Sequence, residues 1–557
     1  MTYAKFVAQI LSSFDIKTVF TVPGGGCIHL IDAFEQSPDI ELVGMPSEHA
    51  ATVAASAYAL AHETIGVVLV TTGPGSTNAM TGVAASWIDS VPLLVISGQV
   101  QQKDINRGRA RQKGFQEVSI NQMVQPIVKK FYTCTGEFGD KEEITYVWEK
   151  MIEEARCSRE GPVWIEVPLD VQGQEVTPST AFADSGSAEL DADLQKCKRP
   201  LLLIGRGVHH PHAVSEFLTY YDMPLMLTWR AIDYATDDFP NFIGRPGIYG
   251  QPAANQALSK CDLLICVGAR LDAGQIAWDQ KSFAPQAKKY IVDIDSGELE
   301  KLSELTHASY LCLESYEFFD LNFYSERTWP EWLAECQKSR QENPVVTDIH
   351  RQPYDRVNIY NFLDVLFDLA PENTMFVPSS SGAASEIFMQ VARMKKGQRV
   401  INHPGLGSMG FALASAIGVY FSTKQPVICI EGDGSAAMSL AELQFIKDHL
   451  LPIKVFLLQN DGYGSIQATQ DKFFGRRALS SFSTGLIMPD FGEVTHHITD
   501  NDRESMSTVI QEVLDANGHC LCAVDLELDG ISGLLRVQAH QNDDGTFSAG
   551  RLEDISF

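Results

Sequence analysis

Short runs of apolar residues, many of them β-branched, alternate along the chain with longer stretches that have helical periodicity. Nine of these runs are apolar at nearly every position, and they form three groups: Val67–Thr71, Leu93–Ser97 and Val163–Val167; Leu201–Ile204, Leu263–Val267 and Tyr290–Ile294; Met375–Val377, Val427–Ile430 and Lys454–Leu458. Strands that are apolar on both faces are typical of parallel sheets covered by helices on both sides. The pattern therefore predicts an α/β protein made of three successive doubly wound parallel-sheet domains.

Polar segments separate the three groups of strands. Residues 172–198 are rich in Ser, Ala, Asp and Thr, and residues 337–355 are polar, so we expect both segments to be linkers. Residues 531–557 have weak periodicity and are expected to form a tail that packs over another surface. The expected domains are 1–175, 190–338 and 355–530.

Amino-acid composition excludes some classes of binding partner and indicates the cellular compartment of the protein. The 557 residues include 43 Lys+Arg and 71 Asp+Glu, a formal net charge of −28, and such a surface repels nucleic acids and anionic membranes. The eleven cysteines are scattered, and the closest pair, Cys520 and Cys522, has no matching partner pair, as in proteins that keep reduced thiols. The amino terminus lacks a signal-peptide pattern, and no apolar run approaches the ~20 residues of a membrane span. We therefore expect a cytoplasmic protein.

Two of the predicted strands end in oxygen-bearing side chains. Asp433 lies between Gly432 and Gly434, and Asn460 follows 460 − 433 = 27 positions later, an interval that holds one crossover helix. Parallel strands would bring both side chains to one carboxyl edge, where open α/β sheets bind ligands. Asp, Asn and a backbone carbonyl are suitable ligands for a Mg²⁺ ion that also binds phosphate oxygens. The two glycines would let the backbone come close to a diphosphate, and Ser435 is expected to open a helix whose N-terminus favours anions. The alternative is a simple Gly-Asp-Gly turn with an unrelated asparagine.

Gly-Asp-Gly followed by Asn at this interval resembles the binding signature of enzymes that use thiamin diphosphate (ThDP). The other thirds contain segments in the order found in the acetolactate synthase-like branch of these enzymes: Pro23–Gly26, Pro46–Ala50, Thr72–Asn78, Ser97–Val100, Gly114–Glu117 and Gly405–Gly410. The resemblance covers nearly the whole chain. It implies pyrimidine-binding, central and diphosphate-binding domains in that order, with Mg²⁺ held by Asp433, Asn460 and the carbonyl of Gly462.

The same resemblance implies roles around the cofactor. Glu48 would hydrogen-bond the pyrimidine N1′ and promote removal of the proton from the reactive carbon, and a buried carboxylate there should titrate upward. The alternative is a first-turn glutamate favoured by the helix dipole. The carbonyl of Gly407 would accept the 4′-amino group, and Met409 would wedge the cofactor into its bent shape. Without the resemblance, Met409 would be core filler.

Further candidates face the substrate. The resemblance implies that Gln116 reaches the substrate-derived intermediate, and the backbone amides of Gly24 and Gly25 could stabilise an oxyanion. His29 is a candidate for substrate contact and His49 a weaker one, the alternative for both being a structural role. The basic run Arg107–Arg111 is either an anion clamp or a solvated segment.

Two features refine the comparison with acetolactate synthases: candidate nucleotide-binding segments in the middle domain, and Thr469 at a position where those enzymes have Trp. Gly205–Gly207, Gly268–Asp272 and Asp293–Asp295 follow predicted strands, and in acetolactate synthase-like proteins this domain carries a non-redox FAD, another nucleotide or nothing. Acetolactate synthases proper have Trp nine positions after the metal-ligating Asn, where this chain has Thr469. The missing ring should widen the acceptor side. The segments Arg111–Glu117 and Asp544–Asp554 look more similar to carboligases of branched-sugar (yersiniose-type) biosynthesis.

These features lead to a hypothesis and its alternatives. The enzyme would decarboxylate pyruvate or a close 2-oxo acid and transfer the acyl-carbanion equivalent to a ketone, keto-sugar or 2-oxo acid acceptor. Acetolactate synthase proper, a decarboxylase that releases an aldehyde, and a non-catalytic ThDP-fold binding protein remain as alternatives. In the family that the chain resembles, active sites lie between subunits, which implies a homodimer or homotetramer.

Overall fold

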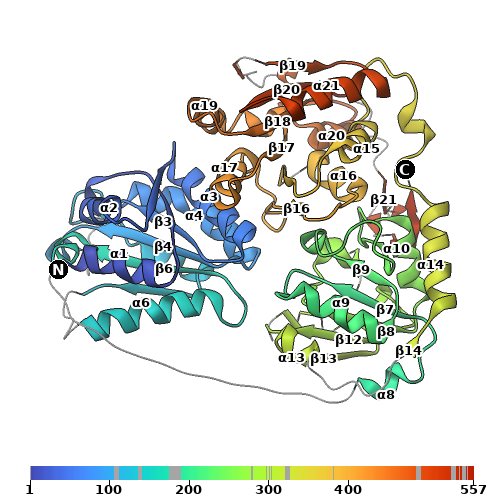
Figure 1. The fold of residues 1–557 in the computed structure, drawn as a ribbon, viewed down its shortest axis with the longest axis horizontal. Coiled ribbons are helices and arrows are strands. Elements are labelled where there is room, and N and C mark those ends of the chain that lie inside the picture. Colours follow the sequence, from blue (N-terminus) through green and yellow to red (C-terminus); the bar gives the residue numbers. More distant parts are fainter. Residues whose placement is uncertain are drawn as a thin grey trace.

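The computed structural model describes most of the chain (Figure 1). The described residues are 2–105, 112–135, 141–174, 190–277, 280–295, 298–299, 301–302, 304–319, 327–380, 382–484, 491–492, 494–527, 535–537, 540–541, 547–548 and 550–556. The Arg107–Arg111 run therefore lies outside the described residues, as does Asp544.

The first domain is a six-stranded parallel sheet in the order β2-β1-β3-β4-β6-β5. Its strands are β1 (Thr18–Thr21), β2 (Glu41–Gly44), β3 (Gly66–Val70), β4 (Leu93–Gln99), β5 (Lys130–Thr133) and β6 (Pro162–Pro168). Its helices are α1 (Tyr3–Ser13), α2 (Ile28–Glu35), α3 (Glu48–His62), α4 (Pro74–Ile88), α5 (Ile120–Val124), α6 (Lys141–Arg156) and α7 (Leu169–Gln172).

The middle domain has a parallel sheet in the order β10-β9-β7-β11-β12-β13. Its strands are β7 (Pro200–Ile204), β9 (Leu225–Leu227), β10 (Phe242–Gly244), β11 (Leu263–Val267), β12 (Lys288–Asp293) and β13 (Ala308–Cys312), and β8 (Tyr221–Asp222) pairs separately with β14 (Arg327–Thr328). Its helices are α8 (Asp191–Leu194), α9 (Pro211–Tyr220), α10 (Pro252–Lys260), α11 (Ala273–Ile276), α13 (Ser315–Phe319) and α14 (Pro330–Glu342). This is the strand order of dinucleotide-binding folds, with its switch point between β7 and β11.

The last domain repeats the strand order of the first, as β16-β15-β17-β18-β20-β19, again all parallel. Its strands are β15 (Met375–Pro378), β16 (Arg399–Val400), β17 (Val427–Gly432), β18 (Ile453–Gln459), β19 (His496–Ile498) and β20 (Cys520–Asp525). Its helices are α15 (Ile359–Leu369), α16 (Ala383–Val391), α17 (Ala412–Thr423), α18 (Asp433–Ala436), α19 (Leu440–Asp448), α20 (Gly464–Phe474) and α21 (Arg503–Asp515).

The predicted architecture is confirmed, with one change at a linker. All nine predicted apolar runs form strands of the three sheets. The expected linker 337–355 is wrong at its start, because α14 continues through residue 338 to Glu342. The buried residues Trp332, Leu333 and Cys336 hold this helix against the middle domain, while its polar last turn faces solvent and resembles a linker in sequence.

The carboxyl-terminal tail packs over the other domains, as expected. The side-chain amide of Asn255 donates to the carbonyl of Leu552 at 2.8 Å, and the amide of Val537 donates to the carbonyl of Ile248 at 2.8 Å. Leu535 is buried in the core around α15 of the last domain. The tail has short antiparallel pairs, β21 (Arg536–Val537) with β24 (Ile555–Ser556) and β22 (His540–Gln541) with β23 (Phe547–Ser548).

The first and last domains meet through α3 and α17, which lie side by side (Figure 1). A Cβ atom at Gly418 of α17 would lie 2.1 Å from the carbonyl oxygen of Ala54, so only glycine permits this approach. Within the described ranges, no helix combines the length and apolar character needed to cross a bilayer. All eleven cysteines are described and free.

Candidate functional site

Asp433 is fixed at the carboxyl edge of the last sheet by backbone amides. Its side chain accepts hydrogen bonds from the amides of Gly434 at 2.6 Å, Asn460 at 3.1 Å and Gly462 at 3.2 Å. Burial raises the pKa of its carboxyl to about 6, although these hydrogen bonds favour the charged form. As the strand spacing predicted, β17 and β18 bring Asp433 and Asn460 together.

Three oxygen atoms meet at this edge. The Oδ1 of Asn460 lies 2.8 Å from the carbonyl oxygen of Gly462 and 3.1 Å from Oδ1 of Asp433. Oxygens that share a Mg²⁺ ion at ~2.0–2.1 Å lie about 3 Å from one another. Turning the amide over would make its nitrogen donate to the same two oxygens, so the site is satisfied without a cation and offers three oxygen ligands with one. The residues present therefore fit Mg²⁺.

The glycines beside Asp433 differ in their surroundings. A Cβ atom at Gly434 would lie 2.6 Å from the ring of Tyr463, whereas a Cβ atom at Gly432 would meet no atom within 4 Å. Gly434 is thus required by packing, and Gly432 faces open space that a ligand can enter.

The helix start expected at Ser435 is wrong, whereas the role of Ser435 in cofactor binding stays a prediction. Helix α18 begins at Asp433 and has only four residues, so Ser435 does not open a helix with an anion-binding N-terminus. Its hydroxyl is instead buried and accepts a hydrogen bond from the amide of Gly410 at 2.8 Å. Ser435 therefore anchors the segment Gly405–Gly410 beside the three oxygens.

The segment Gly405–Gly410 has backbone shapes that favour glycine. Gly407 and Gly410 have φ values of +64° and +77°, which side chains strain to adopt. The amide of Gly407 donates to the carbonyl of His403 at 3.2 Å, and Met409 is half-buried. Gly407 and Met409 thus lie on a tightly turned loop at the edge that carries Asp433.

Glu48 lies at the carboxyl edge of the first sheet, as the first residue of α3. The helix is capped by Ser47, whose hydroxyl accepts from the amide of Ala50 at 3.1 Å. One carboxylate oxygen of Glu48 accepts from the amide group of Asn78 at 3.1 Å, and a Cβ atom at Gly75 would lie 3.2 Å from the other. Glu48 is half-buried rather than buried, because it begins its helix at the open edge of the sheet.

The turn after β1 packs against the turn after β3. A Cβ atom at Gly24 would lie 2.5 Å from Thr71, and one at Gly26 would lie 2.0 Å from the hydroxyl of Thr72. At Gly25 a Cβ atom would meet nothing within 4 Å. Gly24 therefore packs against its neighbours, and the backbone at Gly25 is accessible to a ligand.

Gln116 is brought to the same edge through its backbone. Its φ is +61°, and its carbonyl oxygen would lie 1.9 Å from a Cβ atom at Gly73, so the turn rests on the start of α4. Its side chain is exposed, and that of Phe115 is 86% exposed. His29 is exposed on α2. The ring of His49 lies 5.3 Å from that of Phe411, and burial lowers its pKa, which favours the structural alternative for His49.

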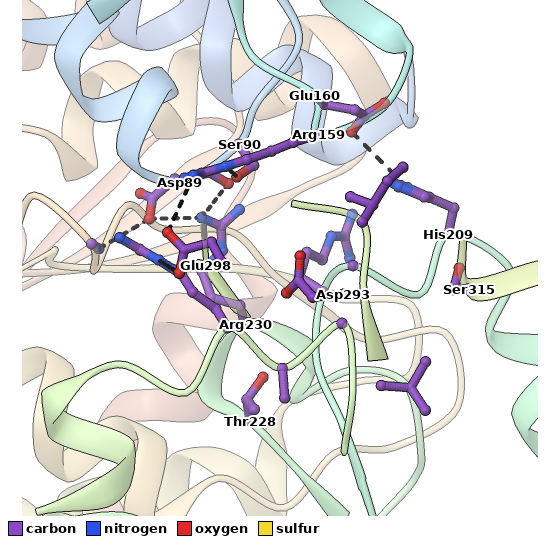
Figure 2. A pocket seen from close by; sticks show the side chains of 18 of the residues that line it. Asp89, Ser90, Arg159, Glu160, His209, Thr228, Arg230, Asp293, Glu298 and Ser315 are labelled. Carbon is purple, nitrogen blue, oxygen red and sulfur yellow. Dashed lines mark hydrogen bonds and ion pairs between the residues drawn. The ribbon is translucent and has the colours of Figure 1, made fainter. Parts of the chain in front are cut away.

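A cavity of about 600 Å³ lies where the three domains meet (Figure 2). It is lined by residues from the three middle-domain segments named above, Gly205–Gly207, Gly268–Asp272 and Asp293–Asp295. These segments therefore converge at the switch point between β7 and β11. A Cβ atom at Gly207 would lie 2.7 Å from the Cα of Gly268, so two glycines are needed for the strand ends to meet.

Sequence reasoning missed the cavity walls that come from other segments. Arg159 of the first domain donates to Asp295 at 2.9 Å and Glu298 at 3.2 Å, and Arg230 donates to Asp89 at 2.8 Å. Apart from Asp295, these residues lie outside the segments named from the sequence and follow no amphipathic pattern. Their meeting depends on how the domains pack, which local sequence does not reveal.

Comparison with known proteins agrees with the geometry. Models of the thiamine pyrophosphate enzymes match residues 1–123 (N-terminal TPP binding domain), 189–309 (central domain) and 380–524 (C-terminal TPP binding domain). The chain is 29% identical over 550 residues to the acetolactate synthase isozyme 2 large subunit of Escherichia coli (strain K12), covering 95% of this chain and 96% of that protein. It is 28% identical over 509 residues to the acetolactate synthase large subunit of Lactococcus lactis subsp. lactis (strain IL1403), covering 88% and 85%.

A plant relative extends the comparison. The chain is 28% identical over 504 residues to the chloroplastic acetolactate synthase of Arabidopsis thaliana, covering 86% of this chain and 73% of that protein. Thiamine pyrophosphate is another name for ThDP, and its domains occur here in the order expected from the motifs. The chain therefore belongs to the thiamine pyrophosphate enzymes, in their acetolactate synthase-like branch.

Proposed function

We propose that the enzyme decarboxylates pyruvate, or a close 2-oxo acid, and transfers the acyl unit to a carbonyl acceptor. The observation that carries this proposal is the set of three oxygens from Asp433, Asn460 and Gly462, which fits Mg²⁺ bound to a diphosphate. When bound, ThDP supplies the nucleophilic carbon and the electron sink for decarboxylation.

Residues at the carboxyl edge of the last sheet would bind the cofactor, and Glu48 at the edge of the first sheet would activate it. Asp433, Asn460 and the Gly462 carbonyl would hold Mg²⁺, and the open side of Gly432 would admit the diphosphate. The Gly407 carbonyl and Met409 would hold the aminopyrimidine. Glu48, oriented by Asn78, would share a proton with its N1′ atom.

The substrate would approach the first sheet. Gln116 is exposed beside the start of α4, where it would contact the reacting substrate. The accessible backbone at Gly25 would stabilise negative charge on a carbonyl oxygen, with Gly24 holding the turn. His29, exposed on the helix after this turn, is the remaining candidate for substrate contact.

The acceptor side favours a ketone or keto-sugar over a second 2-oxo acid. Thr469 is exposed on α20, and its hydroxyl donates to the carbonyl of Ser465 at 2.9 Å, within its own helix. A short side chain satisfied in this way leaves room above the helix. The names of the relatives favour acetolactate synthesis as the second candidate.

The middle domain would bind FAD in a non-redox role. The cavity lies at the switch point of a dinucleotide-type sheet. At its wall, Nε of Arg270 is buried without a hydrogen-bond partner, with the carboxylate of Glu298 3.8 Å away. An anionic nucleotide would satisfy this donor, so the residues fit the group. Flavin absorbance in the purified protein, together with release of the flavin when the protein is denatured, would support this assignment.

We also propose that the enzyme works as a homodimer or homotetramer in the cytoplasm. Large apolar side chains lie exposed near the two edges, including Ile28, Phe115, Met438 and Ile466. A second copy would cover them. The free cysteines suit a reducing compartment.

Product analysis tests the proposed reaction. The enzyme, with Mg²⁺ and ThDP, is given ¹³C-pyruvate alone or with a ketone, a nucleotide-linked keto-sugar or 2-oxobutyrate, and products are identified by mass spectrometry. We expect labelled two-carbon units on the ketone or keto-sugar. Labelled acetolactate as the main product from pyruvate alone and with the ketone or keto-sugar, and labelled 2-aceto-2-hydroxybutyrate with 2-oxobutyrate, would favour acetolactate synthase proper. Acetaldehyde as the main product would favour a decarboxylase.

A further inference from the structure

A single carboxylate joins all three domains beside the cavity. Asp89, directly after α4 of the first domain, has a side chain that is 1% exposed. Its Oδ1 atom accepts from Arg230 of the middle domain at 2.8 Å and from the amide of Gly405 of the last domain at 3.1 Å. Arg230 also donates to the carbonyl of Asp89 at 2.9 Å, and Figure 2 shows this guanidinium directed at Asp89.

The contact with Gly405 depends on close approach. A Cβ atom at Gly405 would lie 2.2 Å from Oδ1 of Asp89 and 2.8 Å from the side chain of Ile88. Any larger residue would push the loop away from Asp89. The glycine is therefore explained by this carboxylate, independently of any ligand.

The loop that Asp89 holds leads into the proposed cofactor site. Two residues beyond Gly405 lies Gly407, whose amide donates to the carbonyl of His403. The ring of His403 is buried, with its Nε2 atom 2.9 Å from the hydroxyl of Ser56 in α3. At the far end, Gly410 is tied to Ser435. The loop is thus clamped at both ends, by the first domain at Gly405 and by the metal-side turn at Gly410.

Helix α4 links the same carboxylate to Glu48. The helix begins beside Glu48, where Gly75 and Asn78 approach its side chain, and it ends at Ile88, directly before Asp89. Arg159 fixes this end as well, since it donates to the hydroxyl of Ser90 at 2.8 Å. Asp89 therefore ties the loop carrying Gly407 to the end of the helix that orients Glu48. With active sites between subunits, these two elements of one chain serve different active sites, so the direct task of Asp89 is to hold the Gly407 loop.

We propose that Asp89 is a positioning residue for catalysis, with Arg230 holding its charge. The proposal rests on the proposed function, because it assigns Asp89 the task of placing the Gly407 carbonyl against the aminopyrimidine. Asp89, Arg230 and Gly405 also line the interdomain cavity, so a nucleotide bound there contacts the same junction. Misplacing a positioned group by ~1 Å costs about 10²-fold in rate.

The test uses two variants that each remove one charge of the pair, with matched controls. Asp89→Asn removes the charge but keeps an acceptor, and Arg230→Gln removes its partner. The controls are Asp237→Asn and Arg340→Gln, because Arg340 donates to both the carboxylate and the carbonyl of Asp237, the same bonding pattern away from the loop. For each protein we would measure kcat and KM for pyruvate, the Kd of ThDP with Mg²⁺, the circular dichroism signal of the bound aminopyrimidine, and Tm.

The outcomes separate this inference from the proposed function. We expect Asp89→Asn and Arg230→Gln to lose about 10²-fold in kcat. Their KM for pyruvate should be nearly unchanged, their aminopyrimidine signal altered, and their Tm close to that of the controls. Equal kcat and signal in test and control variants, or a loss explained wholly by Tm, would overturn the positioning role. Wild-type protein that binds no ThDP would overturn the proposed function and this inference with it.

Discussion

Asp433 is bonded to three backbone amides independently of any cation, so its carboxylate is preorganised at the strand end. The same preorganisation applies to Glu48, which Asn78 orients and Gly75 accommodates. In both cases the small neighbours are as necessary as the acid itself. The proposed reactions of Asp433 and Glu48 therefore depend on neighbouring residues that hold the two carboxylates in place without reacting themselves.

Replacing Asp433 with Asn tests the metal site. The variant keeps the size of the side chain but replaces one anionic ligand with an amide, so we expect the Mg²⁺ concentration for half-maximal ThDP binding to rise by about 10-fold or more. Fluorescence titration with Mg²⁺ at fixed ThDP measures this change. Asp461→Asn, at the neighbouring half-buried acid, is the control. An unchanged Mg²⁺ requirement in Asp433→Asn would remove Asp433 from the metal site.

Replacing Glu48 with Gln tests the proton role. The amide can still accept from Asn78 but cannot share a proton with a ring nitrogen, so we expect kcat to fall about 10²–10⁴-fold with Tm nearly unchanged. Steady-state CO₂ release from pyruvate measures this loss. Glu35→Gln, at the end of α2, serves as the control. Near wild-type turnover in Glu48→Gln would contradict the assignment.

Residue-level prediction from sequence succeeded where spacing and a strand end fixed the position. Asp433 and Asn460 are examples, because the interval of one crossover helix determines where both lie. The hydrogen-bond partners of Ser435, Asp89 and Arg230 could not be predicted, since these partners come from distant segments or other domains.

Among the elements, helices α3 and α17 make the close contact between first and last domains. Gly418 allows it, as its missing Cβ leaves room for the carbonyl of Ala54. Strand existence followed from continuous apolar runs, whereas short strands such as β16, with two residues, carry too little pattern to be predicted. The extent of α14 was also hidden, because its polar last turn resembles a linker.

Gly418→Ala tests this helix contact. Alanine favours an isolated helix by about 1 kcal/mol over glycine, but the added methyl group collides with backbone, so we expect a net destabilisation of about 1–3 kcal/mol. Urea unfolding monitored by circular dichroism measures it. Ser422→Ala, on the same helix, removes a hydroxyl that is buried without a hydrogen-bond partner, so it should not destabilise the protein. Stabilisation of Gly418→Ala would show that the helices are farther apart.

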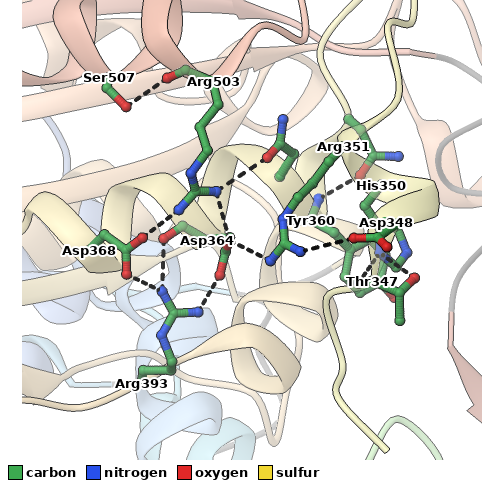
Figure 3. Close-up of polar contacts among 12 residues, drawn as sticks. Thr347, Asp348, His350, Arg351, Tyr360, Asp364, Asp368, Arg393, Arg503 and Ser507 are labelled. Atoms are coloured by element: carbon green, nitrogen blue, oxygen red, sulfur yellow. Dashed lines mark hydrogen bonds and ion pairs between the residues drawn. The ribbon is translucent and has the colours of Figure 1, made fainter.

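Three arginines converge on two aspartates of α15 (Figure 3). Asp364 pairs with Arg503 at 2.7 Å, with Arg351 at 3.2 Å and with Arg393. These three pairs connect α15 to α21, to the 3₁₀ turn Asp348–Arg351 and to the end of α16, respectively. Burial alone would raise the pKa of Asp364, but the attraction of Arg393 and the hydrogen bonds from the arginines hold it below its usual value.

This network predicts a pH dependence of stability. A lowered folded-state pKa gives stability that is fully present above the unfolded value of about 3.9 and is lost as pH falls through the folded value. We expect Asp364→Asn to lose about 3 kcal/mol at pH 7 and the difference from wild type to shrink below about pH 4. Urea unfolding from pH 3 to 8 measures both. The more exposed Asp368→Asn should lose less than about 1 kcal/mol. A constant difference at all pH values would contradict the network's role.

At the scale of the whole molecule, the first and last sheets share one strand order, and the middle sheet has another. The three-domain arrangement was predictable because each domain has its own apolar strands. The cavity between the domains was not, since domain packing leaves no periodic signal. With a net charge of −28, the protein must hold anionic ligands through local cations and amides, as the Mg²⁺ site and the arginines of the cavity would do.

Calorimetric titration of ThDP into the wild-type protein tests whether the three oxygens at the edge of the last sheet bind the cofactor through Mg²⁺. The titration is run once with Mg²⁺ and once with a chelator that removes divalent cations. We expect saturable binding with Mg²⁺, near one ThDP per chain, and binding weakened at least about 10-fold with the chelator. Absence of binding in the presence of Mg²⁺, or equal binding with the chelator, would contradict it.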